Sequence, residues 1–151
     1  MDALRWVQDL PFSVWSRGSS WAVFTWLIVH MWGLAFLAGA GALVAGRKLG
    51  LARSIDPALF ARFLPVMWAG FALALTSGVL LLMAYPAKAL TNPVFAVKMA
   101  FLTAAALLTR RMFKAPARSR ATAIAALFAW AGLIACGNLL KYTHHILLVY
   151  E

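Results

Sequence analysis

Four long apolar stretches, separated by short polar segments, dominate the hydrophobic pattern of this 151-residue chain. They cover about residues 20–46, 59–84, 93–113 and 120–145. Each stretch is long enough for a helix that crosses a hydrocarbon core of roughly 30 Å. The pattern therefore predicts an all-α integral membrane protein, a bundle of four transmembrane helices that forms one domain over residues 1–151.

The first residues follow a different pattern, in which tryptophans stand among charged side chains. Residues 2–17 are too short and too polar to span a bilayer, and Trp6 and Trp15 are typical of the headgroup region. Pro11 is expected to divide this segment into two pieces. We therefore predict an amphipathic interfacial segment, and we expect no cleaved signal peptide because the segment lacks an apolar core followed by a cleavage site.

Composition and charge support a membrane protein with a defined orientation. The chain is 64% hydrophobic and 12% charged, whereas soluble chains run nearer ~45–50% and ~25%. The net charge of +10 is concentrated in the first-to-second and third-to-fourth helix loops, which argues against a nucleic-acid partner. The positive-inside rule places these loops in the cytoplasm. We expect a multi-pass protein of the bacterial inner membrane with both termini in the periplasm.

His30 is the first candidate for chemistry, because it stands about mid-way along an apolar stretch. An ionisable group at that depth costs roughly 2–3 kcal/mol, and such residues usually face a partner or a cofactor. His30 shares a helix face with Gly33 and Gly41, and this face admits either a neighbouring helix or a flat cofactor. The residues alone leave three roles open for His30: a hydrogen-bonded structural side chain, a haem or metal ligand, and a quinone or proton site.

Lys98 and two histidines near the C-terminus complete the set of candidates. Lys98 falls one to two turns into the third helix, where it either extends to the outer interface or holds a positive charge near an anionic partner. His144 and His145 are either interfacial side chains or ligands for copper or haem iron, since imidazole binds both metals. At ~1.5 Å per residue, His144 lies on the order of 10 Å farther from the cytoplasmic end than His30, which argues against a shared haem.

The acidic residues and the cysteine exclude several activities. No carboxylate stands within the four apolar stretches, because the acids lie at the termini or in loops: Asp2, Asp9, Asp56 and Glu151. A carboxylate-driven proton pump or cation transporter is therefore not expected. Cys136 is the single cysteine, so an intrachain disulfide and a cysteine-based zinc site are excluded.

Several segments of residues 13–113 resemble a family of small bacterial inner-membrane proteins of unknown function. The segments are Val29-His30-Met31-Trp32-Gly33, Leu64-Pro65-Val66-Met67-Trp68-Ala69-Gly70-Phe71, Thr76-Ser77-Gly78 and Asn92-Pro93-Val94-Phe95-Ala96-Val97-Lys98-Met99. The layout is more distantly similar to oxygen-independent protoporphyrinogen oxidase (HemJ-type) proteins and to the copper-resistance protein D-like membrane domain. The resemblance implies that His30 binds haem b and that Lys98 matches the lysine of the HemJ-type proteins. The chain lacks their aromatic–Leu–Pro–Arg stretch around helix one, so the resemblance implies haem binding and leaves the oxidase activity open.

These observations favour a small membrane redox subunit that binds b-type haem and passes electrons between quinone and a membrane or periplasmic partner. His30 would be the haem ligand, Gly33 and Gly41 would lie beside the cofactor, and Lys98 would pair with an anionic group on the haem or the quinone. Whether the chain acts as an oxidoreductase itself is left open.

Three other functions are also compatible with the sequence. The chain can be a non-catalytic accessory subunit that packs in a larger membrane complex or in a homo-oligomer. It can also be an enzyme of porphyrin oxidation, or a copper-handling protein that uses His144 and His145. The lipid bilayer is a partner in every case.

Overall fold

The computed structural model describes residues 2–51, 62–114 and 120–146, which are helical and contain no strand. Four helices are long and apolar enough to cross a membrane: α3 (Ala22–Leu49), α5 (Leu64–Ala84), α7 (Pro93–Lys114) and α8 (Arg120–Ile146). Three short helices accompany them: α1 (Asp2–Gln8), α2 (Pro11–Gly18) and α6 (Pro86–Leu90). The predicted all-α bundle of four membrane-spanning helices is confirmed.

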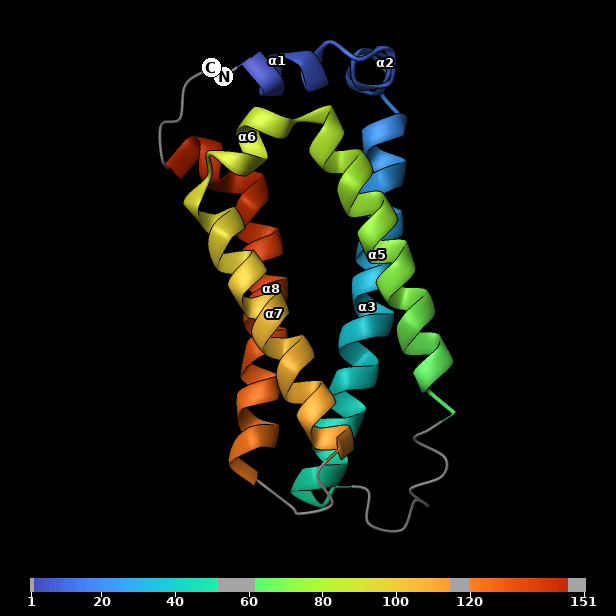
Figure 1. The fold of residues 1–151 in the computed structure, drawn as a ribbon, viewed down its shortest axis with the longest axis vertical. Coiled ribbons are helices and arrows are strands. Elements are labelled where there is room, and N and C mark those ends of the chain that lie inside the picture. Colours follow the sequence, from blue (N-terminus) through green and yellow to red (C-terminus); the bar gives the residue numbers. More distant parts are fainter. Residues whose placement is uncertain (1, 52–61, 115–119, 147–151) are drawn as a thin grey trace.

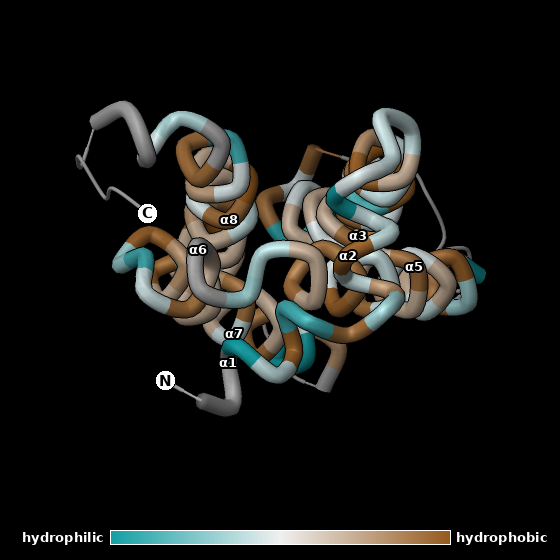
Figure 2. The backbone as a smooth tube through the Cα atoms, turned by 90° about the horizontal axis from the view of Figure 1, so that it is seen from above, coloured by the Kyte–Doolittle hydropathy of each residue, from teal (hydrophilic) through white to brown (hydrophobic). Residues whose placement is uncertain are grey.

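The four long helices form two pairs, as Figure 1 shows. α3 packs along α5, α7 packs along α8, and α3 joins the pairs through its contacts with α8 and α7. Seen from above, the pairs lie side by side (Figure 2). α1, α2 and α6 lie across one end of the bundle, and the opposite end carries the basic residues of the helix ends: Arg47, Lys48, Arg110, Arg111 and Arg120. The charge asymmetry expected from the loops is therefore present between the two ends.

The bundle buries small side chains and exposes large apolar ones. Ala45, Ala105 and Ala126 are fully buried, whereas Trp32 is 65% exposed and Phe128 is 70% exposed. Large exposed aromatic rings are stable in lipid, where small residues at helix contacts let the backbones approach closely. This distribution indicates that the protein is surrounded by a lipid bilayer.

The helix α2 also turns its apolar side chains outward. Ser13 and Ser16 are fully buried against the rest of the protein, while Val14 is 53% exposed and Trp15 is 57% exposed. An outward apolar face on a short helix at the end of the bundle is expected where that helix meets acyl chains and headgroups. The structure therefore agrees with an interfacial segment, divided at Pro11 as predicted.

Arg17 of α2 connects this helix to the C-terminal ends of α1 and α5. Its guanidinium donates one hydrogen bond to the Gln8 carbonyl at 2.7 Å and another to the Ala84 carbonyl at 3.0 Å. The last carbonyls of a helix lack partners within the helix, so a basic side chain that reaches them stabilises the helix end. Arg17 thus fixes α1 and α2 over the end of α5.

Three element boundaries differ from the prediction or fall outside the described ranges. α3 continues through Gly46 and ends at Leu49, because Gly50 (φ 93°) is the left-handed residue that terminates it. The predicted turn between the second and third spans contains the short helix α6. α5 begins at Leu64, and the predicted start at residue 59 lies outside the described residues.

A glycine–glycine contact sets the distance between α3 and α5. A Cβ atom at Gly33 would lie 2.5 Å from the Ala74 nitrogen, and a Cβ atom at Gly70 would lie 2.8 Å from the Phe36 Cβ. The two backbones therefore touch where neither helix has a side chain. This contact brings the next turn of α5 to His30, which lies three residues before Gly33.

We expect Gly33→Ala to destabilise the bundle, because the added methyl group would collide with the backbone of α5. The expected loss in the free energy of unfolding is about 1–3 kcal/mol, as for other overpacked interiors. Gly39 is a matched control in the same helix, since nothing lies within 4 Å of a Cβ built there. Unfolding in mixed detergent micelles should show a loss for Gly33→Ala and none for Gly39→Ala; equal stabilities would contradict the contact.

Candidate functional site

The imidazole of His30 is half-buried on α3 and bonds to α5. Its Nδ1 atom lies 2.9 Å from the Ala74 carbonyl oxygen and 3.1 Å from the Ser77 Oγ. Because a carbonyl oxygen only accepts, Nδ1 must carry the hydrogen and donate it to Ala74. In the neutral ring, Nε2 is then an acceptor with a free lone pair.

The segment Thr76-Ser77-Gly78 of α5 shapes the place where this ring lies. The Ser77 hydroxyl donates to the Leu73 carbonyl, so its lone pairs are the part that faces His30. Gly78 makes room for the ring, because a Cβ atom there would lie 3.1 Å from the His30 Cε1. One turn of α5 thus fixes the orientation of His30 and directs Nε2 away from α5.

Lys98 of α7 approaches the other side of the ring. Its Nζ atom lies 3.4 Å from the His30 Nε2, and the side chain is only 9% exposed. The amine also passes Gly137 of α8, where a Cβ atom would lie 3.9 Å from Nζ. Of the two roles considered for Lys98, extension to the outer interface is therefore not found. The amine points into the bundle, where α3, α7 and α8 meet.

The bundle offers this amine no carboxylate. The spans of α3, α5, α7 and α8 contain neither Asp nor Glu. An ammonium group has three hydrogens to donate, and the one acceptor found for it, the His30 Nε2, is at the long end of hydrogen-bond distances. A buried charge without an opposite charge costs several kcal/mol. The centre of the site is therefore suited to an anion.

The other two predicted cofactor residues pack helices together. Gly33 meets the backbone of α5, as described above. Gly41 faces the indole of Trp130, whose Nε1 donates to the Thr109 Oγ1 at 3.2 Å, so a Cβ atom at Gly41 would overlap the ring. Both glycines thus serve helix packing, one of the two uses that their spacing allowed. The structure brings together His30 and Lys98, and a flat group has no room against Gly33 or Gly41.

The two C-terminal histidines stand in the last turns of α8, and their side chains lie outside the described residues. The helical rise places the backbone of His144 about 10 Å beyond Gly137, the α8 residue beside Lys98. Among the side chains that the structure does describe, no group of three or more His, Cys, Asp or Glu gathers. A metal site at His144 and His145 stays a prediction.

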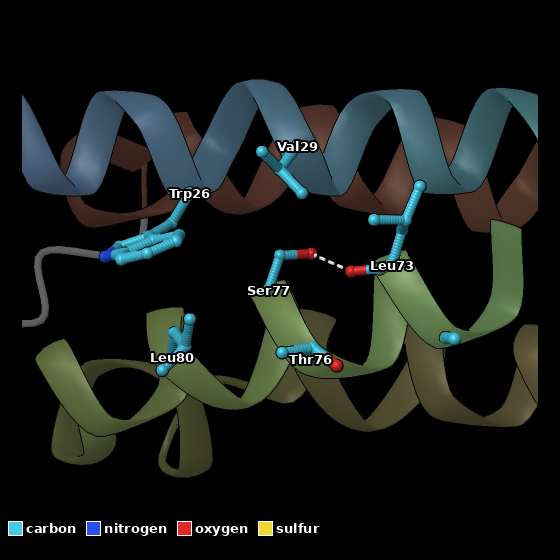
Figure 3. A pocket seen from close by; sticks show the side chains of 7 residues that line it. Trp26, Val29, Leu73, Thr76, Ser77 and Leu80 are labelled. Carbon is cyan, nitrogen blue, oxygen red and sulfur yellow. Dashed lines mark hydrogen bonds between the residues drawn. The ribbon is translucent and has the colours of Figure 1, made fainter. Parts of the chain in front are cut away.

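An open hollow of about 190 Å³ lies between α3 and α5 (Figure 3). Ser77 is shared with the histidine site, but neither His30 nor Lys98 lines the hollow. Val29 borders the hollow. The side chain of the next residue, His30, is rotated by about 100° around the helix axis and points toward α7. The hollow is therefore separate from the site; its walls are Trp26, Val29, Ala72, Leu73, Thr76, Ser77 and Leu80.

The sequence pointed to His30 and Lys98 but not to the groups that position them. The Ala74 carbonyl carries no signal in the sequence, and Ser77, Gly78 and Gly137 have the small side chains common in membrane helices. A weak signal was present in Thr76-Ser77-Gly78, which interrupts an apolar stretch with hydroxyl groups and a glycine.

We expect Lys98→Met to stabilise the protein when no haem is bound, because the cost of a buried charge without an opposite charge is larger than the stabilisation from the long contact of the amine with the His30 Nε2. The expected gain in the free energy of unfolding is about 1 kcal/mol or more. Lys98→Arg keeps the charge and should show no gain. Thermal unfolding of haem-free protein in detergent checks this, and a clear loss of stability in Lys98→Met would count against an unpaired charge.

Comparison with models of protein families, with curated proteins and with solved structures finds no match to this chain. The function is therefore argued from the geometry of the site.

Proposed function

We propose that this chain is a small redox subunit of the bacterial inner membrane that binds b-type haem through the Nε2 atom of His30. It would pass electrons between quinone and a membrane or periplasmic partner. The observation that carries the proposal is the hydrogen bond from the His30 Nδ1 to the Ala74 carbonyl, at 2.9 Å. Metal-ligating histidines almost always donate their other ring N–H in this way, which fixes the tautomer and the ring orientation.

The donor atom fits the group, but its binding requires the space in front of Nε2 to open. Nε2 carries no hydrogen, and the Lys98 amine stands 3.4 Å in front of it. The lysine side chain has a flexible four-carbon stem, so the amine can turn away from Nε2 while the ring stays bound to Ala74. When bound, the haem supplies a one-electron carrier within the bilayer. His30 is the residue assigned as a ligand, and Gly33 and Gly41, which were expected beside the cofactor, are occupied by helix contacts.

Lys98 has a second role in this proposal. Its ammonium lies beside the ligand atom and has no carboxylate in the spanning helices. An anionic group on the cofactor, or a quinone oxygen, would accept hydrogens of the amine once it has turned away from Nε2. In this proposal His30 binds the iron, and Lys98 binds an anionic or polar group of the haem or the quinone.

The absorption spectrum of the purified protein tests this proposal. The reduced-minus-oxidised spectrum of wild type in mild detergent should show a Soret band and an α-band of b-type haem. His30→Ala should lose both bands, because the ligand atom is gone. Thr103→Val, a matched control at an exposed position of α7, should keep them. Absence of the bands in wild type, or equal bands in His30→Ala, would refute haem binding at this residue.

A second function, an accessory subunit of a larger membrane complex, is favoured by a specific observation. Both ring nitrogens of His30 bond within the protein, and together they link α3 to α5 and to α7. These bonds stabilise the contacts among the three helices without any cofactor. Large aromatic side chains that face outward, such as Trp32 and Phe128, would then contact protein as well as lipid.

Purification from native membranes separates this function from the first. An accessory subunit should co-purify with a stoichiometric partner, and deletion of this chain should lower the amount of that partner. A solitary, monodisperse protein that carries haem would exclude the accessory function.

The proposed function includes the orientation of the bundle in the inner membrane. We place the basic end of the bundle in the cytoplasm and α1, α2 and the end of α8 at the periplasmic face. Alkaline phosphatase fused to the C-terminus should therefore be active, because that enzyme requires the periplasm, and green fluorescent protein at the same position after Sec export should be dark. The reverse pattern would contradict this orientation.

A further inference from the structure

We infer that Lys98 and His30 form a receptor for a carboxylate carried by an apolar, membrane-soluble molecule. The carboxylate has two possible sources, the propionates of haem and a free fatty acid. The inference rests on the proposed function only if haem is the source, because the binding of a fatty acid does not require iron at His30.

The positive charge of Lys98 has no opposite charge inside the bundle. The Lys98 side chain is 9% exposed, and its amine lies among three helices that contain no acidic residue. Other basic side chains of the spanning helices stand toward the helix ends, for example Arg110 and Arg111, which are exposed. A carboxylate at Lys98 would therefore supply the opposite charge that the chain itself does not place inside the bundle.

The hydrogen bonds of His30 and Lys98 leave donors of the ammonium group without an acceptor in the described part of the bundle. The His30 Nδ1 is committed to the Ala74 carbonyl, so Nε2 can only accept from the Lys98 amine. This contact takes one of the three ammonium hydrogens, and no further acceptor is found among the described residues. The ring and the amine lie against Gly78 and Gly137, which place no side chain over them. Two hydrogens thus remain for the two oxygens of a ligand.

Depth decides the class of anion. Lys98 is the sixth residue of α7, so its backbone lies about 8 Å below the start of that helix. A doubly charged phosphate would leave a net negative charge beside one ammonium, and the singly charged phosphodiester of a membrane lipid lies at the headgroup level, above Lys98. A single carboxylate on an apolar body forms a neutral pair with Lys98, and its apolar part remains in the hydrocarbon. The chemistry of the site therefore selects a carboxylate.

Paired ligands test the receptor. Purified haem-free protein in uncharged detergent is titrated with palmitate and methyl palmitate, and with haem and haem dimethyl ester, while the tryptophan fluorescence is followed. In each pair the ester lacks only the charge. Wild type should bind at least one acid tenfold or more tighter than its ester. Lys98→Met should bind acid and ester alike, Lys98→Arg should retain the preference, and Lys48→Met, at the basic end of the bundle, should behave like wild type.

Each outcome decides the inference. A preference for palmitate supports it and identifies a free fatty acid as the source, whereas a preference for haem alone supports it and identifies the propionates. Equal affinities for acid and ester in wild type, in both pairs, would overturn it, as would a preference that survives in folded Lys98→Met. If Lys98→Met does not fold, the affinities of wild type for acid and ester decide the inference by themselves.

The same titrations separate this inference from the proposed function. A preference for palmitate in a protein without haem bands would leave the receptor intact and remove the redox subunit. Haem bands together with equal affinities for acid and ester in both pairs would leave the redox subunit intact and remove the receptor.

Discussion

A polar group inside a bilayer must find its partner within the protein, and His30 meets this constraint at both ring nitrogens. Nδ1 donates to a backbone carbonyl of α5, and Nε2 accepts from the Lys98 amine of α7. Lipid offers neither partner, so the loss of either contact would leave a buried group unsatisfied. The orientation of one ring therefore depends on three helices, and the positions of those helices are what the rest of the fold provides.

The contact between Gly33 and Gly70 provides the first of these positions, because it brings α3 and α5 close enough for the histidine to reach a main-chain oxygen. The second comes from Asn92, which directly precedes α7. The Asn92 Oδ1 accepts from the Val94 nitrogen at 2.9 Å, and its side-chain amide donates to the Thr143 Oγ1 of α8 at 2.6 Å. These contacts fix α7 against α8. Lys98 is thereby held at the depth of His30, away from the water at the helix ends.

The helices were predictable and the site was predictable only in part, for different physical reasons. The spans follow from apolar length, and the asymmetry of the ends follows from where the basic residues stand. His30 and Lys98 were conspicuous as ionisable residues in apolar stretches, but their contact depends on how two distant helices rotate. The spacing of Gly41 suited a cofactor as well as a helix, and only the position of Trp130 shows that a ring fills that face. The end of α3 was missed because Gly46 is tolerated within the helix and Gly50 terminates it.

Both the haem proposal and the carboxylate receptor require that the Nε2 atom of His30 carries no hydrogen. Nitrogen-15 NMR of histidine-labelled, haem-free protein in detergent measures the protonation of each ring nitrogen, and a His30→Ala sample identifies the signals of this ring. The account predicts a hydrogen on Nδ1, none on Nε2, and a shift of the Nε2 signal in Lys98→Met. A ring that carries its hydrogen on Nε2, with a bare Nδ1, would contradict it.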